Sequence, residues 1–319
     1  MRLGIGTKLF AGFGIVLALM IGVGTVGVWS LSAVTDNVRA VAKAEFDRAI
    51  AEITETGFEV HETVRNVRRR LKRVRSIIRL IRPAFPNHVR ENSLLRDTGA
   101  EVSELRDAAA LVEAADRLSK GVNGEAGEAL QALRQRLASR AAAEEAKLDR
   151  DAFLLGLRAK LREARVRSEL WELKAGGAKA VVPGFVATYT KAREGRRAAA
   201  KSPSNEHLHE WRKTVKFHWA QLGLLRRFAP EFAEARREQA KRLAETLGDH
   251  HNLCVLRAAL ADEEEIAIGP LIDAELGKLG KRALKLGRGL FAETPEEVER
   301  RWRATFADWE AVGRLRKRE

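Results

Sequence analysis

The clearest pattern of apolar and polar positions in the chain lies between residues 60 and 81. Apolar side chains recur there in alternating steps of four and three, at Val60, Val64, Val67, Leu71, Val74, Ile78 and Ile81. Because this heptad spacing places all of them on one side of an α-helix, it predicts a helix with one face buried against a partner.

A basic stripe runs beside the apolar one, displaced by one residue. It consists of His61, Arg65, Arg68, Lys72, Arg75, Arg79 and Arg82, and it is widened by Arg69 and Arg73. Between Arg65 and Arg82 there are nine basic residues and no acidic one. A solvated helix usually alternates acidic and basic residues, which stabilise one another in i,i+4 pairs. The stripe therefore predicts a face that binds an anion.

A related helix is expected to begin near Ser204, after a loop in which serine and proline supply the cap and the break. Its basic residues are spaced 0, 3, 4 and 7, which places them on one face: His209, Arg212, Lys213 and Lys216. An offset of 144 residues aligns residues 68–72 with residues 212–216. This alignment predicts an internal duplication, with two pseudo-equivalent helical bundles related by an approximate two-fold axis.

The composition supports a helical protein with a polyanionic partner. The 319 residues are 45% hydrophobic and only 6% aromatic, with seven prolines, which favours an all-α fold with a substantial core. A single cysteine, Cys254, excludes an internal disulfide and a cysteine-based zinc site. The formal net charge of +14 makes nucleic acid, an anionic membrane surface or a phosphate polymer the expected partner.

Residues 9–31 form an uncharged run that precedes the basic helices. At about 1.5 Å per residue, its 23 residues span a hydrocarbon core of roughly 30 Å, so we expect a transmembrane helix within an anchor of residues 1–38. A cleaved signal peptide is the alternative, but its apolar core has about 7–15 residues and Leu31-Ser32-Ala33 is a poor cleavage site. Residues 1–38 are also similar in composition to the first membrane helix of bacterial chemoreceptors.

Several further segments together resemble one protein family. They are LHEWRKTVKF (residues 208–217), LGDHHNLCVL (247–256), the basic run 61–83, GFVATYTKAREGRR (184–197) and the pair Arg106-Asp107. In these the chain resembles the CHAD family, the conserved histidine α-helical domain, over roughly residues 50–315. The resemblance implies a pair of antiparallel four-helix bundles whose basic helices line a shared positive groove or pore. It also implies binding of inorganic polyphosphate without enzymatic activity.

These observations together predict an all-α protein with one transmembrane helix before two bundles. The first bundle is expected in residues 45–140 and the second in residues 141–315. Because side chains at i, i+3, i+4 and i+7 advance about 5.4 Å per turn, each basic stripe can track an extended polyanion. Arginine adds planar donors that match phosphate oxygens.

The candidate polyphosphate-binding residues come from four helical stretches. They are His209, Arg212, Lys213 and Lys216; His61, Arg65, Arg68, Arg69, Lys72, Arg75 and Arg79; Lys191, Arg193, Arg196 and Arg197; and Lys281, Arg282 and Lys285.

An enzymatic function is not expected from this sequence. The E-x-E-x-K signature of tunnel-type triphosphatases and a Walker loop are both absent, and no paired carboxylates stand among the basic stripes. His250 and His251 would point about 100° apart on a helix, which favours a structural or phosphate-contacting role over metal binding. We therefore expect neither a metal nor another cofactor.

Two alternative partners stay open. Nucleic acid fits the charge and is expected to bind weakly, but neither basic stripe carries interleaved aromatic residues for stacking. Anionic lipid beside the anchor is the other partner. The expected location is the bacterial inner membrane, with the basic domain in the cytoplasm, and the alternative is a cytoplasmic protein on polyphosphate granules. The sequence predicts no particular oligomeric state.

Overall fold

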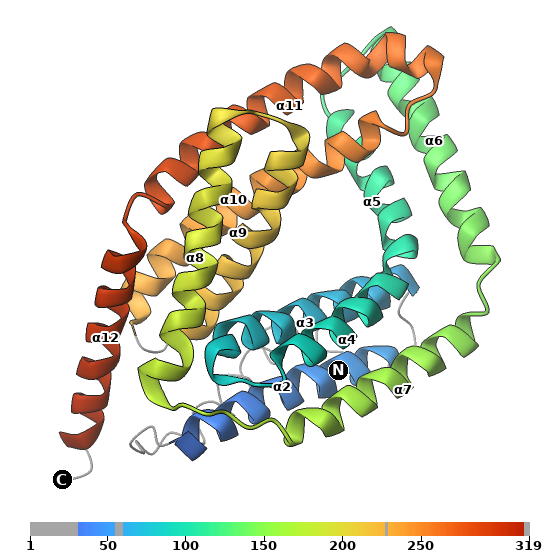
Figure 1. Ribbon diagram of the computed structural model, residues 1–319. Helices are drawn as coiled ribbons and strands as arrows, with labels where there is room; N and C mark the ends of the chain where they lie inside the picture. The colour runs from blue at the N-terminus through green and yellow to red at the C-terminus, as the bar shows by residue number, and fades with distance from the viewer. Residues whose placement is uncertain (1–30, 55–59, 227–228, 316–319) are drawn as a thin grey trace, which may run out of the picture.

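The computed structural model describes residues 31–54, 60–226 and 229–315, and every secondary-structure element in these ranges is a helix (Figure 1). The helices are α2 (Leu31–Thr54), α3 (Val60–Ile81), the 3-10 turn η1 (Arg82–Ala84), α4 (His88–Glu101), α5 (Ser103–Leu118), α6 (Glu125–Ala146), α7 (Arg150–Glu169), α8 (Gly177–Lys201), α9 (Asn205–Leu225), α10 (Pro230–Arg257), α11 (Asp262–Leu290) and α12 (Pro295–Leu315). The all-α prediction is confirmed.

Two groups of four helices each form a closed set of contacts. In the first, α2 packs on α3, α3 on α4, α4 on α7, and α7 on α2. In the second, α8 packs on α9, α9 on α10, α10 on α11, and α11 on α8, while α12 lies against α8. Helix α7 packs with the first group although the expected boundary at residue 140 assigns it to the second. That boundary and the two-fold relation stay predictions.

Helix α3 buries the apolar stripe that the heptad spacing predicted. All seven side chains of the stripe are at most 2% exposed, and they belong to a core that continues into α8, α9 and α10. The two groups meet closely at Gly184 of α8, where an added Cβ would lie 1.9 Å from the carbonyl oxygen of Leu80. Only glycine permits this contact between the two backbones, so α3 and α8 are held in one register.

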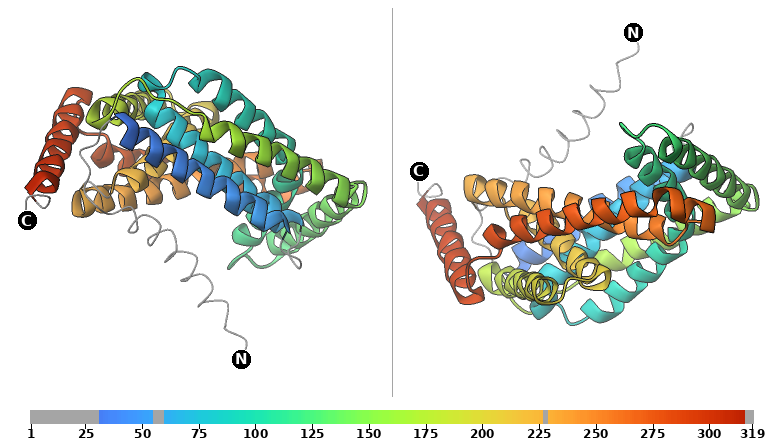
Figure 2. Two further views of the ribbon diagram at one scale, coloured as in Figure 1. Left: turned by 90° about the horizontal axis from the view of Figure 1, so that it is seen from below. Right: turned by 90° about the horizontal axis from the view of Figure 1, so that it is seen from above.

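A second, smaller core lies where the α5–α6 hairpin packs on α10 and α11. Leucines of α6 meet leucines of α10 and isoleucines of α11 there: Leu130, Leu133, Leu137, Leu253, Leu256, Ile268 and Ile272. This core joins the far ends of the long helices α10 and α11 to the hairpin. The views of Figure 2, from below and from above, show the hairpin at the end of the molecule away from α12.

Four helices are connected in a ring that positions the basic stripes. Helix α3 contacts α9, α9 contacts α10, α10 contacts α5, and α5 returns to α3. In Figure 1 these helices surround the centre of the view. Helices α3 and α9 carry the two predicted basic stripes, so the fold brings the two helices that carry them into contact.

No helix within the described ranges is long and apolar enough to cross a membrane. The predicted span, residues 9–31, lies outside the described residues except for Leu31, where α2 begins. The transmembrane helix therefore stays a prediction.

Candidate anion-binding site

One side of α3 faces α2, and its arginines are paired there with acids. Arg70 donates to Glu52 at 2.8 Å and to Glu45 at 3.3 Å, and Arg73 donates to Glu45 at 3.3 Å. Burial lowers the pKa of Arg70, but the hydrogen bond to Glu52 and the charge of Glu45 outweigh it, so the pKa is raised. These cations are neutralised within the fold.

The opposite side of α3 turns two arginines towards α9. The guanidinium carbon of Arg79 lies 4.1 Å from the centre of the Phe217 ring, and that of Arg75 lies 5.8 Å from it. Arg75 also donates through Nε to the amide oxygen of Asn92 at 3.2 Å. Within the described ranges, no acidic side chain comes within ion-pair distance of Arg75 or Arg79.

Burial shifts the titration of both arginines. It lowers the pKa of Arg75 to about 10; the charges of Arg79 and Arg96 add to the effect, and the charge of Asp97 opposes it. It lowers the pKa of Arg79 as well, with the charge of Arg82 as the second cause. Both guanidiniums nevertheless stay protonated at neutral pH, so α3 presents two half-buried positive charges to α9.

Helix α9 begins where the sequence predicted. The side chain of Ser204 accepts a hydrogen bond from the backbone N–H of His207 at 3.1 Å. Trp211 is completely buried against Gly287 of α11, where an added Cβ would come 2.5 Å from the indole ring. Trp211 therefore fixes the rotation of α9.

The side of α9 that meets α10 carries a histidine pair. Nδ1 of His209 and Nδ1 of His251 are 2.9 Å apart, which is a hydrogen bond in which one ring donates and the other accepts. Burial lowers the pKa of His251 to about 3, and the charges of Arg212 and His209 add to it. Burial and the charges of Lys213 and Arg212 lower the pKa of His209. At neutral pH the two rings are therefore neutral, and the positive charge beside them comes from Arg212 and Lys216, with Lys213 paired to Glu210.

The comparison with protein families decides what this fold is. Residues 40–261 match the CHAD domain. The chain belongs to the CHAD family. The match includes both the arginines at Phe217 and the histidine pair, and it ends before α11.

Two solved structures share the fold of this CHAD domain. PptA from Streptomyces chartreusis is 16% identical, with a TM-score of 0.54 over 83% of this chain and 100% of its own. The CHAD domain from the plant Ricinus communis is 19% identical, with a TM-score of 0.52 over 83% of this chain and 93% of its own. No curated protein matches the chain.

Other predicted residues of the two CHAD basic helices lie at the edges of the site. Lys213 pairs with Glu210 at 2.5 Å, Arg65 lies 3.7 Å from Glu62, and Arg69 donates to Asn66 at 3.1 Å. Of the remaining two, Arg68 is half-buried and Lys72 is exposed. His61 lies away from α9, because its Nε2 is 2.9 Å from the carboxylate of Glu145 on α6.

The predicted residues of α8 and α11 occupy other faces of the CHAD domain. Arg196 packs against Gly287 of α11, and Arg193 is close enough to Glu297 of α12 to help lower the pKa of that carboxyl. Lys191 and Arg197 are exposed on α8, and Lys281, Arg282 and Lys285 are exposed on α11. Arg193 and Arg196 are thus turned towards α12 and α11, whereas His209, Arg212 and Lys216 are turned towards α10.

Two site residues were missed by reasoning from the sequence. His251 was left between a structural and a phosphate-contacting role, and the structure places it against His209. The other is Phe217 of α9, whose ring lies against Arg75 and Arg79 of α3. Helical spacing could not reveal this contact, since Arg79 and Phe217 are far apart in the sequence.

His250 takes a different role from its neighbour His251. It is 3% exposed, and its Nδ1 lies 3.5 Å from the sulfur of Cys254. Burial lowers the pKa of His250. Across the part of the chain that the structure describes, no three histidine, cysteine, aspartate or glutamate side chains are grouped to hold a metal ion.

Proposed function

We propose that the protein binds inorganic polyphosphate, without acting as an enzyme, through the facing sides of α3, α9 and α10. The observation that carries this proposal is that the arginines on the two sides of α3 have different partners. Arg70 and Arg73 have acidic partners on α2, whereas Arg75 and Arg79 are half-buried beside a neutral amide and an aromatic ring. A desolvated cation without an acidic partner is costly, and an anionic ligand relieves that cost.

The second support is the face of α9. Arg212 and Lys216 lie beside the His209–His251 pair, on a helix that contacts α3. Arginine offers two parallel donors to phosphate oxygens, and lysine offers a mobile point charge. Cations on two adjoining helices suit an extended ligand of closely spaced negative charges, and the CHAD family resemblance favours polyphosphate among such ligands.

The test compares polyphosphate with nucleic acid. Labelled long-chain polyphosphate is titrated with the full-length protein, and duplex DNA of equal total charge competes at the same ionic strength. We expect polyphosphate to bind at least about tenfold more tightly, with affinity falling steeply as salt rises because binding releases counterions. Equal competition by DNA would replace this function with general polyanion or nucleic-acid binding.

The basic face of α9 provides the first set of variants. Reversing the charge of Arg212, Lys213 and Lys216 to glutamate is expected to weaken polyphosphate binding strongly while the helical circular dichroism stays unchanged. Unaltered binding would place the site elsewhere, and the exposed lysines of α11 would be reversed next.

We also propose that residues 9–31 tether this polyphosphate-binding domain to a membrane. The support is the sequence alone: 23 uncharged residues that end where α2 begins. Carbonate extraction of membranes is expected to leave the full-length protein in the pellet, and deletion of residues 9–31 is expected to release it. Protease accessibility of the basic domain in sealed vesicles then reports the side on which it lies. Complete extraction of the full-length protein would favour the granule-bound alternative.

A further inference from the structure

Among the residues that the structure describes, two phenylalanines each lie beneath two guanidinium groups. At Phe232, the guanidinium carbons of Arg236 and Arg301 are 5.2 Å and 5.0 Å from the ring centre. At Phe217, those of Arg79 and Arg75 are 4.1 Å and 5.8 Å from the ring centre. The negative face of an aromatic ring attracts such cations, and the attraction grows as water is excluded.

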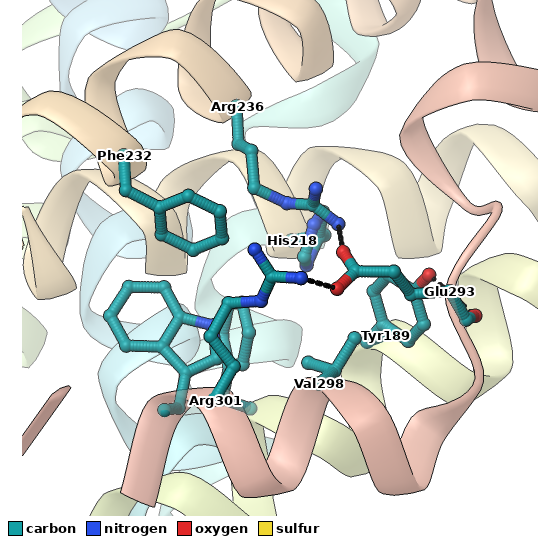
Figure 3. Close-up of a pocket in the computed structure, with 9 residues that line it drawn as sticks. Tyr189, His218, Phe232, Arg236, Glu293, Val298 and Arg301 are labelled. Atoms are coloured by element: carbon teal, nitrogen blue, oxygen red, sulfur yellow. Dashed lines mark hydrogen bonds and ion pairs between the residues drawn. The ribbon is translucent and has the colours of Figure 1, made fainter. Parts of the chain in front are cut away.

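At Phe232 the arrangement is completed by a carboxylate. Glu293, in the turn before α12, bridges the two arginines: one oxygen is 2.5 Å from Nη2 of Arg236, and the other meets Nη2 of Arg301. Figure 3 shows the carboxylate of Glu293 between the two guanidiniums. Tyr189 donates to the backbone carbonyl of Glu293 at 2.9 Å and fixes the turn. The chain thus shows how two arginines held by one ring take up an anion.

Phe217 likewise has two arginines over its ring, Arg75 and Arg79, but no carboxylate of the described residues bridges them. Nε of Arg79 is buried without a hydrogen-bond acceptor in the described part of the chain, and Nε of Arg75 is bound to Asn92. The ring and the amide therefore fix the stems of both side chains. Arg75 and Arg79 are also one helical turn apart, which directs both forks to one side of α3.

We propose that Arg75 and Arg79, held over Phe217, form a phosphate-binding subsite in which phosphate oxygens take the place that the Glu293 carboxylate takes at Phe232. The subsite rests on the proposed polyphosphate function and deepens it. Phe217 acts as a positioning residue: it holds two cations in place before the ligand arrives, which reduces the entropy that binding must remove.

The subsite also has a consequence for selectivity. A nucleobase binds an aromatic side chain by stacking on its face. Arg79 covers one face of Phe217 at 4.1 Å, so a base cannot stack on that face while the arginine is in place. The arrangement therefore favours a polyanion without bases.

The first experiment changes the ring and keeps the charges. In full-length protein, Phe217→Leu is expected to weaken polyphosphate binding about fivefold, in line with the loss of a partly desolvated cation–π contact. Phe217→Tyr is expected to retain wild-type affinity. The matched control is Phe232→Leu, which removes the ring from the Glu293-bridged site and should change polyphosphate affinity less than about twofold. Wild-type affinity in folded Phe217→Leu, or an equal loss in Phe232→Leu, would overturn the subsite.

The second experiment uncovers the ring. Arg79→Gln is expected to weaken polyphosphate binding about tenfold and to improve competition by single-stranded DNA relative to wild type, because the face of Phe217 becomes available. Arg73→Gln removes the same charge from the Glu45-paired side of α3 and should change polyphosphate affinity less than about twofold. Equal losses in the two variants would show that only net charge matters.

The outcomes separate the two proposals. Wild-type protein that fails to bind polyphosphate overturns the proposed function and the subsite together. Wild-type protein that binds, with Phe217→Leu and Arg79→Gln binding equally well, overturns the subsite alone. Thermal melts of each variant show whether a loss of affinity reflects a loss of fold.

Discussion

The two sides of helix α3 carry the same residue type in two different electrostatic settings. On the side that faces α2, Arg70 and Arg73 share the carboxylates of Glu45 and Glu52. On the side that faces α9, Arg75 and Arg79 contact the amide of Asn92 and the ring of Phe217, and the carboxylate nearest in effect, Asp97, is paired with Arg96. The first side joins two helices of the first bundle. On the second side, no ion pair within the described residues compensates the two charges, which is why we propose that an external anion binds there.

This difference shows that counting cations does not locate a binding site. A basic side chain contributes to ligand binding to the extent that the fold leaves its charge uncompensated, because a charge that is already paired gains little from a second anion. The variants below test whether the α9-facing side controls binding while the α2-facing side controls stability.

The largest effect is expected from reversing the α9-facing pair. Arg75→Glu combined with Arg79→Glu should weaken polyphosphate binding by about 100-fold or more, because two charge-assisted contacts of roughly 1.5–3 kcal/mol are lost and repulsion is added. Fluorescence anisotropy with labelled polyphosphate measures this loss. The matched control reverses Arg158 and Arg162 of α7, which have the same spacing of four, and should cost less than about threefold. Similar losses in both double variants would show that binding depends on net charge and not on the α9-facing side of α3.

The α2-facing side should affect stability instead. Glu45→Gln leaves Arg73 without its carboxylate and Arg70 with only Glu52, so we expect the free energy of unfolding to fall by about 2 kcal/mol. Urea unfolding measures this change. Glu62→Gln is the control, because its partner Arg65 lies 3.7 Å away at an exposed position, and less than about 0.5 kcal/mol is expected there.

A Glu45→Gln variant that kept its stability and lost its polyphosphate affinity would contradict the assignment of the α2-facing side of α3 to stability. Polyphosphate binding by folded Glu45→Gln is expected to stay within about twofold of wild type, since Arg70 and Arg73 are held by α2 rather than by the ligand.

A smaller effect on stability is expected at the core side of α9. His218 is completely buried, and neither ring nitrogen has a hydrogen-bond partner among the described residues. Burial, with the charge of Arg236, lowers its pKa from 6.5 to about 3. An unfolded histidine takes up a proton below about pH 6.5 while the folded one does not, so the free energy of unfolding should fall as the pH drops from 6.5 towards 3.

Replacing His218 with leucine tests this pH dependence. We expect His218→Leu to raise stability at pH 7 by about 1 kcal/mol, because an unsatisfied polar group leaves the core, and to flatten the decline in acid. Urea midpoints at several pH values measure the wild type and His218→Leu, and an unaltered slope in the variant would contradict the role of His218 in the acid dependence.

Local patterns predicted the elements of this protein well. The heptad of α3 specified both a helix and its buried face, and Ser204 specified the start of α9, because spacing and capping act within a few residues. What could not be predicted is which cations are compensated, since Glu45 reaches Arg70 from a different helix.

The candidate site depends on contacts between distant segments for the same reason. Phe217 meets Arg79 only because α9 packs on α3, and His209 meets His251 only because α9 packs on α10. Sequence spacing predicted which residues share a face of each helix. The packing of the helices determines which faces meet, and therefore which of the predicted basic residues lie close together.

The smallest expected effect is on the pH dependence of binding, and it extends the comparison from α3 to α9. Burial and nearby cations lower the pKa of His209 and of His251, so the pair carries no charge at neutral pH in the free protein. A bound phosphate beside Arg212 and Lys216 offsets those cations and raises the pKa of His209. Binding is then coupled to proton uptake, and affinity should increase about two- to fivefold as the pH falls from 7.5 to 5.5. His209→Asn should abolish the increase while His250→Asn, on the side of α10 that faces Cys254, retains it. An identical pH profile in wild type and His209→Asn would show that the pair holds α9 to α10 without taking part in binding.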